Sequence, residues 1–467
     1  MTEPRPPAEE RLQRAAEPEK NVAAGTRALV LGPYLVRRRV RRGGPVEGDG
    51  PSNPRSEDAR LDEAVGLAQA IDLNVLAAIP VSLNALRPAT YLGKGKVEEI
   101  AGLVRADSVG LVVMDCALTP VQQRNLEKAW GAKVIDRTGL ILEIFGRRAR
   151  TREGALQVEL AHLSYQKSRL VRSWTHLERQ RGGFGFLGGP GETQIEADRR
   201  LIQERMTRIE RDLETVTQTR ALHRASRRRV PYPIVALVGY TNAGKSTLFN
   251  RLTAAGVLAE NMLFATLDPT SRAIKLPHGE TAILSDTVGF ISDLPTMLVA
   301  AFRATLEDVI EADVLLHVRD ISHGDTDAEA ADVQGVLRDL GINADDHRRI
   351  VEVWNKADLL PAGDRDRLDA SIARMPADRR PALVSAVSGE GIETLLKGIE
   401  RRISEGRSTF QVILDPADGQ GLNWLYEQAE VLDRRTDADG RLHVVARIAP
   451  EKEPRLRTRF PSARHIS

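Results

Sequence analysis

Strand-like and helix-like segments alternate in two separate regions of this sequence, which predicts a multidomain α/β protein. Short apolar runs alternate with stretches of helical periodicity from about residue 58 to 148, and again from about 231 to 406. The second region begins with a strand that leads directly into a glycine-rich turn, as in P-loop domains. At 467 residues, the chain is long enough for about three domains of roughly 150 residues each. We therefore expect a P-loop domain preceded by a small parallel-sheet α/β domain and a helical hairpin, and followed by a small α+β domain.

The first three expected segments differ in composition. Residues 1–55 are rich in Pro, Glu, Arg and Gly, and we expect a disordered N-terminal extension because most of this stretch buries too little apolar surface to offset chain entropy. Residues 56–150 are expected to form an N-terminal α/β subdomain. Residues 151–230 place aliphatic side chains at helical spacing on both sides of a glycine cluster, which predicts a hairpin of two long helices with a Gly-rich loop. The strands expected in the α/β subdomain are Val75–Val81, Val109–Met114 and Lys133–Asp136.

The last two expected segments follow a Pro-Tyr-Pro boundary at residues 231–233. Residues 231–406 are expected to form the P-loop domain, in which strands and helices alternate again. Residues 407–467 are expected to form a small C-terminal α+β domain. Its expected elements are the strands Phe410–Leu414 and Leu442–Ile448 around a helix at Gly421–Leu432.

Overall composition is ordinary for a globular protein in water, with 42% apolar and 28% charged residues. The single cysteine, Cys116, excludes a disulfide within the chain and a cysteine-rich metal site. The first ten residues contain no apolar segment of the kind found in signal peptides, and no apolar run reaches about 18 residues. We therefore expect a cytoplasmic protein without a membrane span. We also expect it to be a monomer.

Positive charge is concentrated in one part of the chain. Residues 137–229 contain 20 Lys and Arg against 11 Asp and Glu, an excess of 9 positive charges, although the whole chain carries only +2. Such a concentration is the electrostatic pattern expected for a surface that binds phosphate backbones. A solvated helical surface crossed by salt bridges has the same composition. Composition alone leaves both interpretations open.

A phosphate-binding loop is predicted at residues 239–246, which read Gly-Tyr-Thr-Asn-Ala-Gly-Lys-Ser and fit G-x-x-x-x-G-K-[ST]. The loop follows a predicted strand and precedes a predicted helix, so backbone N–H groups and a helix N-terminus can face the phosphates. Lys245 is expected to reach the β- and γ-phosphates, and the Ser246 hydroxyl to bind Mg²⁺. The residues expected to bind nucleotide here are Gly239, Tyr240, Thr241, Asn242, Ala243, Gly244, Lys245, Ser246 and Thr247.

A second motif, Asp286-Thr-Val-Gly289, closes an apolar strand forty residues further on. Asp286 is placed to hold the Mg²⁺ shell, and the Gly289 N–H to meet the γ-phosphate. Ras-like enzymes have a water-orienting Gln after this glycine, whereas this chain has Phe290, so slow intrinsic hydrolysis is expected. Between the two motifs, Thr266 and Thr270 are both candidates for a threonine that senses Mg²⁺ and the γ-phosphate.

The base is predicted from Asn355-Lys356-Ala-Asp358 at the end of another strand. The Asp358 carboxylate can accept from N1–H and N2–H₂ of guanine, groups that adenine does not present there. Asn355 is expected on the N7/O6 side, and the Lys356 stem over the ring face. Ser385, Ala386 and Val387 follow a further strand and are expected to present a backbone N–H to O6. All four motifs lie at strand ends, where ligands bind in open α/β sheets, so GTP and GDP are the expected ligands of a P-loop GTPase domain.

Together with these motifs, three stretches closely resemble the HflX-type GTPases of the Obg–HflX branch of translation-factor GTPases. They begin at Tyr91 (Tyr-Leu-Gly-Lys-Gly-Lys-Val-Glu-Glu-Ile), at Arg181 (Arg-Gly-Gly-Phe-Gly-Phe-Leu-Gly-Gly-Pro-Gly-Glu-Thr-Gln-Ile-Glu) and at Phe264 (Phe-Ala-Thr-Leu-Asp-Pro-Thr). The similarity extends from about residue 58 to the C-terminus. It favours Thr266 as the switch threonine, so the resemblance implies that Lys245, Thr266 and Gly289 serve catalysis while Ser246, Thr266 and Asp286 hold Mg²⁺. Asn242 matches a position at which some related GTPases coordinate K⁺.

The resemblance implies a factor that binds the large ribosomal subunit and its ribosomal RNA in the GTP form, and splits or rescues stalled ribosomes under stress. The hairpin loop is then expected to contact RNA through Arg179, Arg181, Phe184 and Phe186, because exposed aromatic rings stack on unpaired bases and arginines bind phosphates. Two other functions are considered: an ATP-dependent RNA remodelling enzyme with a regulatory GTPase domain, and an RNA-binding adaptor with a structural nucleotide. For the first, residues 93–96 (Gly-Lys-Gly-Lys) form either a phosphate loop or a surface turn.

Overall fold

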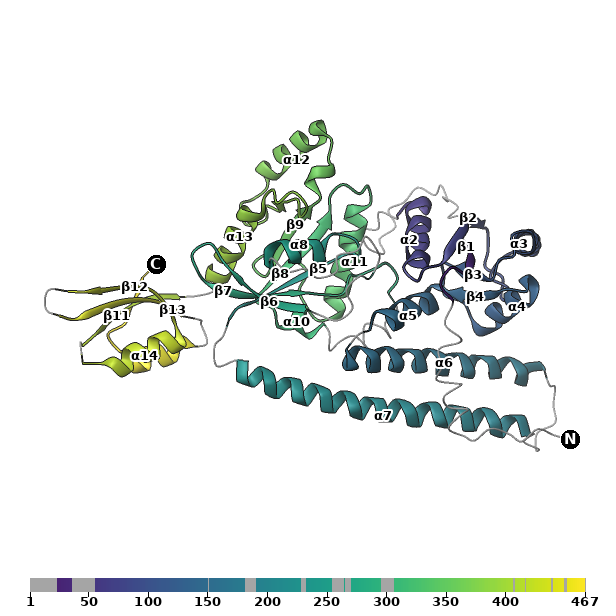
Figure 1. Ribbon diagram of the computed structural model, residues 1–467, viewed down its shortest axis with the longest axis horizontal. Helices are drawn as coiled ribbons and strands as arrows, with labels where there is room; N and C mark the ends of the chain where they lie inside the picture. Colours follow the sequence, from purple (N-terminus) through teal and green to yellow (C-terminus); the bar gives the residue numbers. More distant parts are fainter. Residues whose placement is uncertain are drawn as a thin grey trace, which may run out of the picture.

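The computed structural model describes residues 23–35, 55–149, 151–180, 190–227, 232–253, 264, 270–294, 306–405, 408–415, 417–437, 440–448 and 452–466. Figure 1 shows two α/β bodies side by side, a long helical hairpin beneath them and a small domain at the opposite end from the N-terminal sheet. This arrangement is the multidomain α/β fold that the sequence predicts.

The N-terminal domain has a four-stranded, all-parallel sheet with the order β2-β1-β3-β4. The strands are β1 (Arg27–Leu35), β2 (Asn74–Leu83), β3 (Leu111–Met114) and β4 (Lys133–Asp136). The helices are α2 (Glu57–Gln69), α3 (Lys94–Ala106), α4 (Pro120–Trp130) and α5 (Arg137–Arg148). Asp136 is the N-cap of α5, and its carboxylate accepts from the Gly139 N–H at 2.8 Å.

Strand β1 corrects the expected N-terminal extension. Residues 27–35 lie within the stretch that we expected to be disordered, yet they form an inner strand between β2 and β3. The apolar run from Ala28 to Leu31 is completely buried, because both faces of this parallel strand are covered. The prediction of a disordered extension is therefore wrong for this segment.

The hairpin consists of α6 (Arg152–Gln180) and α7 (Pro190–Arg227), which lie along each other (Figure 1). A narrow apolar seam holds them together, with Leu163 on α6 packed against Ile202 and Ile209 on α7. Helix α7 has 38 residues and is about 57 Å long at 1.5 Å per residue. Figure 1 shows it spanning the length of both α/β bodies.

The central domain has a six-stranded sheet with the order β10-β9-β8-β5-β7-β6. All its neighbouring strands are parallel except β6, which is antiparallel to β7. The strands are β5 (Ile234–Gly239), β6 (Thr270–Lys275), β7 (Thr281–Asp286), β8 (Val314–Asp320), β9 (Ile350–Asn355) and β10 (Ala382–Leu383). Helices α8 (Lys245–Thr253) and α13 (Ile392–Glu405) pack on one face, and α10 (Glu307–Glu311) and α11 (Thr326–Asp339) on the other. The 3₁₀ turn η1 (Ala357–Leu359) and α12 (Ala362–Arg374) follow β9.

The C-terminal domain is an antiparallel sheet with the order β12-β13-β11-β14. Its elements are β11 (Ser408–Leu414), α14 (Gly419–Gln428), β12 (Glu430–Thr436), β13 (Leu442–Ile448), α15 (Glu453–Arg459) and β14 (Arg464–Ile466). The expected helix at 421–432 ends four residues too late, since α14 ends at Gln428 and the chain enters β12 at Glu430. Val431 packs against the core of this domain, so tertiary packing decides the helix end.

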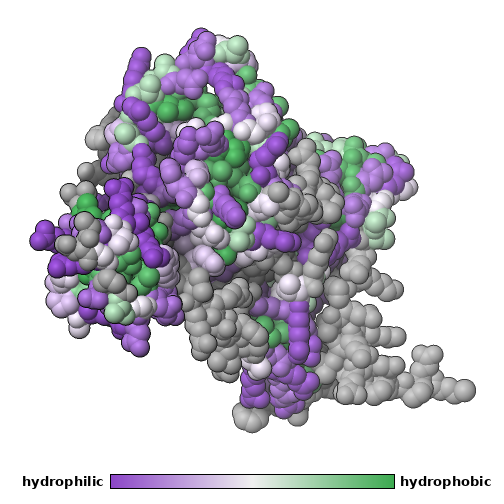
Figure 2. All heavy atoms as spheres, turned by 60° about the vertical axis from the view of Figure 1, so that its left-hand side comes forward, coloured by the Kyte–Doolittle hydropathy of each residue, from purple (hydrophilic) through white to green (hydrophobic). Residues whose placement is uncertain are grey.

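One continuous apolar core joins the N-terminal and central domains. It contains Leu67 and Phe145 from the first domain together with Val238, Phe290 and Val333 from the second. Figure 2 shows one face of the surface, where hydrophilic side chains predominate and hydrophobic ones occupy smaller areas between them. Within the described residues, no helix combines the length and the apolar character needed to cross a bilayer.

Candidate guanine-nucleotide site

The phosphate loop leaves β5 at Gly239 and enters α8 at Lys245. Both of its glycines occupy conformations that disfavour other residues, with φ of +152° at Gly239 and +89° at Gly244. Space is limiting as well, because a Cβ atom at Gly239 would lie 2.2 Å from the Val318 carbonyl oxygen and one at Gly244 2.3 Å from Asn355 Nδ2. The loop is therefore packed tightly between the ends of β8 and β9.

Lys245 lies inside this loop. Its ammonium group donates to the carbonyl oxygens of Gly239 at 3.1 Å and Tyr240 at 2.7 Å, and the side chain is buried. Burial lowers the pKa of Lys245 to about 8, and the nearby Asp286 carboxylate only partly opposes this effect. A cation that is poorly hydrated and fixed beside a helix N-terminus is well placed to bind a phosphate group.

Ser246 and Asp286 converge beside the loop. The Ser246 hydroxyl donates to Asp286 Oδ2 at 2.7 Å, and Asp286 is fully buried at the end of β7. A hydroxyl and a carboxylate are oxygen donors of the type that Mg²⁺ prefers. Within the described part of the chain, no group of three His, Cys, Asp or Glu could hold a metal unaided. The pair therefore fits a Mg²⁺ ion whose other ligands come from phosphates and water. The expected switch threonine, Thr266, lies outside the described residues.

Gly289 approaches the phosphate loop directly. A Cβ atom there would lie 2.9 Å from Thr241 Cγ2 and 3.0 Å from Lys245 Nζ, so only glycine fits. The following residue is paired with the loop, since the Phe290 N–H donates to the Gly239 carbonyl at 3.1 Å and the Thr241 N–H donates to the Phe290 carbonyl at 2.7 Å. Switch II, defined here as residues 286–293, is therefore attached to the phosphate loop by backbone hydrogen bonds.

The residues predicted to select the base lie at the ends of β9 and β10. Asp358 is exposed in η1, whereas Asn355 is almost fully buried. Asn355 Nδ2 donates to the Ala243 carbonyl at 2.9 Å, and its Oδ1 accepts from the Ala386 N–H at 3.0 Å. Asn355 therefore connects the phosphate loop to the segment after β10. That Asn355 lies on the N7/O6 side of the base, and that Ser385, Ala386 or Val387 presents a backbone N–H to O6, remain predictions.

Known protein families match most of the chain. The matching families are described as "GTP-binding GTPase N-terminal" for residues 58–146, "GTP-binding GTPase Middle Region" for 148–227, "50S ribosome-binding GTPase" for 234–356 and "HflX C-terminal domain" for 372–465. A protein named GTPase HflX from Magnetococcus marinus is 54% identical over 379 residues, which cover 81% of this chain and 86% of that protein. The Escherichia coli K12 protein of the same name is 43% identical over 395 residues, covering 83% and 89%.

The chain belongs to the HflX family of GTPases. This membership confirms the resemblance seen in the sequence, the GTPase activity and the guanine-nucleotide ligand. Among solved structures, one titled "crystal structure of SsGBP and GDP complex" is 22% identical, with a TM-score of 0.44, and the match covers 81% of this chain and 98% of that chain.

Three contacts in this HflX-family site could not be expected from the sequence. Asp320, at the end of β8, forms an ion pair of 2.6 Å with Lys356, whose backbone is left-handed at φ +66°. Arg251 on α8 donates to the carbonyl oxygens of Ala386, at 3.0 Å, and Val387, and so fixes the segment after β10. None of these contacts connects residues close in sequence, so no local motif could have revealed them.

Apolar side chains also border the base-selecting residues. Leu359 and Val387 are 61% and 70% exposed, although they are the kind of side chain usually buried. Leu359 follows Asp358 in the sequence, and Val387 is itself one of the residues predicted to contact the base. They can cover a flat base, which gives their exposure a physical reason in this HflX-family protein.

The residues predicted to contact RNA are only partly visible. Arg179 lies in the last turn of α6 without a described side chain, and Arg181, Phe184 and Phe186 lie outside the described residues. A separate cavity of about 250 Å³ lies where helix α2 meets the phosphate loop and the start of α11, with Glu63, Tyr240, Asn242 and Glu329 among the residues that line it. The N-terminal domain therefore forms one border of the region around the phosphate loop.

Proposed function

We propose that this GTPase associates with the large ribosomal subunit as a monomer and splits or rescues stalled ribosomes under stress. The observation that carries the proposal is the hairpin, which extends about 57 Å at 1.5 Å per residue and lies beside the GTPase domain. Arg199, Arg200, Arg208 and Arg211 are exposed along α7. A long, narrow element with exposed arginines suits entry between RNA segments, where phosphates are the main binding partners. The family description "50S ribosome-binding GTPase" for residues 234–356 supports the same partner.

In the proposed hydrolysis step, the residues of this chain mainly bind and orient the triphosphate. Lys245 holds the β- and γ-phosphates, the Gly289 N–H meets the γ-phosphate, and Asp358 selects guanine. Ser246 and Asp286, together with Thr266, would hold Mg²⁺. When bound there, Mg²⁺ would supply positive charge that offsets the charge on the phosphate oxygens. Asn242, exposed at φ +62° in the phosphate loop, would hold K⁺.

The partner is tested by sedimentation with purified ribosomal subunits. The protein should sediment with the large subunit in the presence of a nonhydrolysable GTP analogue, and much less with GDP or with ATP. The Asp358→Asn variant is the matched control, because it should require a xanthosine analogue in place of the GTP analogue. Sedimentation that does not depend on the nucleotide would instead indicate an RNA-binding adaptor with a structural nucleotide. RNA-stimulated ATP hydrolysis by the Lys245→Ala protein would indicate an ATP-dependent RNA remodelling enzyme.

The role of the hairpin loop needs a second test. Replacing Phe184 and Phe186 by Ala should leave nucleotide binding intact and subunit association only modestly weaker, but should abolish splitting. Stacking of an aromatic ring on an unpaired base contributes about 1–3 kcal/mol in comparable sites, which explains the expected loss. Splitting at the parental rate would show that the loop only connects α6 and α7.

A further inference from the structure

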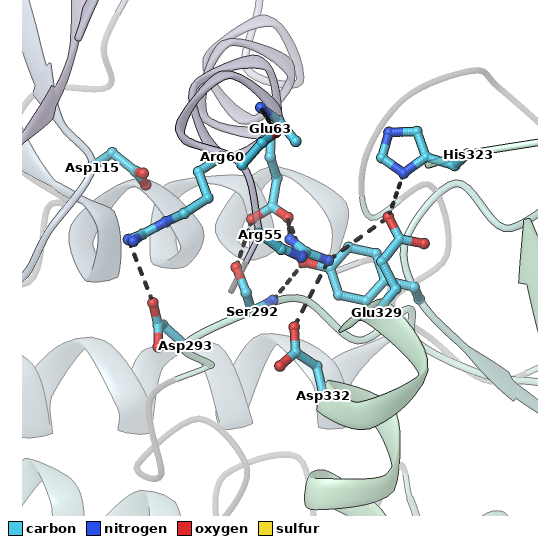
Figure 3. A network of polar contacts seen from close by, with 12 residues as sticks. Arg55, Arg60, Glu63, Asp115, Ser292, Asp293, His323, Glu329 and Asp332 are labelled. Carbon is cyan, nitrogen blue, oxygen red and sulfur yellow. Dashed lines mark hydrogen bonds and ion pairs between the residues drawn. The ribbon is translucent and has the colours of Figure 1, made fainter. Parts of the chain in front are cut away.

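Ser292, at the end of switch II, is held by side chains from both domains. Its N–H donates to the hydroxyl oxygen of Tyr240 at 2.6 Å, and its own hydroxyl donates to Glu63 Oε1 at 3.0 Å. Arg137 Nη2 donates to the Ser292 carbonyl at 3.0 Å and to its hydroxyl oxygen at 2.9 Å. Tyr240, in the phosphate loop, also donates to Glu63. Figure 3 shows Ser292 beside the Glu63 carboxylate. The N-terminal domain therefore contacts switch II only three residues after Gly289.

Asp136, the residue before Arg137, binds helix α6 of the hairpin. Asp136 Oδ1 accepts from the Tyr165 hydroxyl at 2.6 Å, and its Oδ2 accepts from Arg169 Nη2 at 2.7 Å, with both partners on α6. Asp136 and Arg137 are consecutive and begin α5, where hydrogen bonds restrict the backbone. Two neighbouring side chains thus bind different partners: Arg137 binds switch II, and Asp136 binds the hairpin helix α6.

The charged side chains that connect switch II to helix α5 are buried and paired. Arg137 forms ion pairs with Glu63 and, at 2.5 Å, with Asp115. Although burial alone would raise the pKa of the Glu63 carboxyl, the Arg137 and Arg55 guanidinium groups outweigh it and lower that pKa. Leaving such a buried charge without its partner is costly. We therefore expect these ion pairs to switch between discrete arrangements and not to loosen gradually.

Phe264, at the start of the segment that contains Thr266 (switch I), reaches the same helix. Phe264, two residues before Thr266, packs edge-on against Phe145 of α5, with ring centroids 4.7 Å apart. Its backbone is left-handed at φ +57°, which is unusual for an aromatic residue and persists only where packing enforces it. Arg137 and Phe145 lie about two turns apart on α5. One helix consequently contacts both segments that change with the γ-phosphate.

We propose that the start of α5, Asp136 and Arg137, couples the nucleotide state of the switches to the orientation of the α6–α7 hairpin. Arg137 acts as a positioning residue, since it binds Ser292 of switch II. Movement of Ser292 on exchange of GDP for GTP shifts Arg137, and Asp136 passes the shift to Tyr165 and Arg169. The proposal depends on GTP binding and not on ribosome binding, so it can be tested without ribosomes.

The test is the distance between a spin label on the hairpin and one on the GTPase domain in the full-length protein. Glu210→Cys on α7 and Asp369→Cys on α12 place labels at two exposed positions, and Cys116→Ala removes the only native cysteine. Pulsed electron paramagnetic resonance should give different distance distributions with GDP and with a nonhydrolysable GTP analogue. Tyr165→Phe combined with Arg169→Gln should abolish this difference, while the affinities for both nucleotides stay within about twofold, because both side chains bind Asp136 and neither residue belongs to switch II.

Matched variants separate coupling from general damage. Lys167→Gln lies on the same helix but contacts Gln203 of α7, so it should retain the full difference. Ser292→Ala should reduce the difference and change the ratio of the two nucleotide affinities by about fivefold, a common size for coupling between sites. Ser292→Thr keeps the hydroxyl and should restore both. The proposal is overturned if the parental protein gives the same distribution with both nucleotides, or if the Tyr165→Phe, Arg169→Gln protein keeps the full difference.

Discussion

Asn355 and Asp358 come from the same tetrapeptide, but the structure gives them different surroundings. Asn355 is buried, and its amide joins the phosphate loop to the segment after β10. Asp358 is exposed, so its carboxylate is available to a ligand. Base selection should therefore depend on Asp358, while Asn355 holds the phosphate loop against the segment after β10.

The first prediction concerns Asp358→Asn. An amide presents a donor where guanine N2–H₂ needs an acceptor, so the affinity for GTP should fall about 100-fold, as expected for losing two hydrogen bonds to a charged group. Affinity for xanthosine nucleotides should rise, because xanthine carries an acceptor at that position. Titration calorimetry with both nucleotides measures the exchange. Asp364→Asn, on the exposed side of α12, is the control and should bind GTP normally. Unchanged GTP affinity in the Asp358→Asn protein would disprove the assignment.

The second prediction concerns the pH dependence due to Glu329. Burial raises the pKa of this carboxyl to about 7 from an ordinary value of 4.5, and Arg55, 3.7 Å away, opposes the rise. Between these two values the folded protein binds more protons at Glu329 than the unfolded chain does. Stability from this group therefore falls as pH rises from 4.5 to 7, by up to about 3 kcal/mol.

Glu329→Gln should remove this contribution, so its melting temperature should decline less than that of the parental protein between about pH 5 and pH 7.5. Thermal unfolding followed by circular dichroism at several pH values gives the comparison. Asp327→Asn, exposed on the same helix, should keep the parental slope. Equal slopes for the Glu329→Gln and parental proteins would contradict the prediction.

At the scale of secondary-structure elements, patterns within short segments were the most predictable part of the fold. β4 spans the predicted residues Lys133–Asp136, and β5 leads into the predicted phosphate loop, because apolar runs and glycines act locally. β1 was missed because its nine residues stand within a polar stretch, and only pairing with β2 and β3 explains their burial. The contacts of Glu63 and Arg137 with Ser292 were also missed, since they join residues that are 229 and 155 positions apart.

The third prediction concerns Phe290, in the loop after β7. Phe290 replaces the water-orienting Gln of Ras-like enzymes, and its side chain is buried in the shared core. Phe290→Ala should therefore lower the free energy of unfolding by about 3–5 kcal/mol through the cavity that it leaves. Denaturant unfolding measures this loss. The GTPase rate of the protein that remains folded should change less than tenfold, given that a phenyl ring in the core cannot position water.

Phe290→Leu is the matched control and should recover most of the stability, because it refills most of the volume. A large fall in the hydrolysis rate without a loss of stability would show instead that Phe290 takes part in catalysis. Slow intrinsic hydrolysis remains a prediction, which single-turnover measurements without ribosomes can test.

At the scale of the whole molecule, apolar cores define which parts unfold together. The N-terminal and central domains share one core, which includes Phe145, Phe264 and Phe290. The C-terminal domain has a separate core around Phe410 and Leu425. Cooperative unfolding requires continuous packing, so these two bodies should differ in thermal stability.

The last prediction is that calorimetry of the full-length protein shows two transitions. The larger one should contain the N-terminal and central domains together, and GDP should raise its midpoint, because GDP at about 100 times its dissociation constant adds about 2.7 kcal/mol to the body that binds it. The smaller transition should not move with GDP. Leu425→Ala, which empties part of the C-terminal core, should lower only the smaller transition. Separate melting of the N-terminal and central domains would contradict a shared core. If so, the buried contacts between Arg137, Glu63 and Ser292 would be too weak to join the hairpin to the switches.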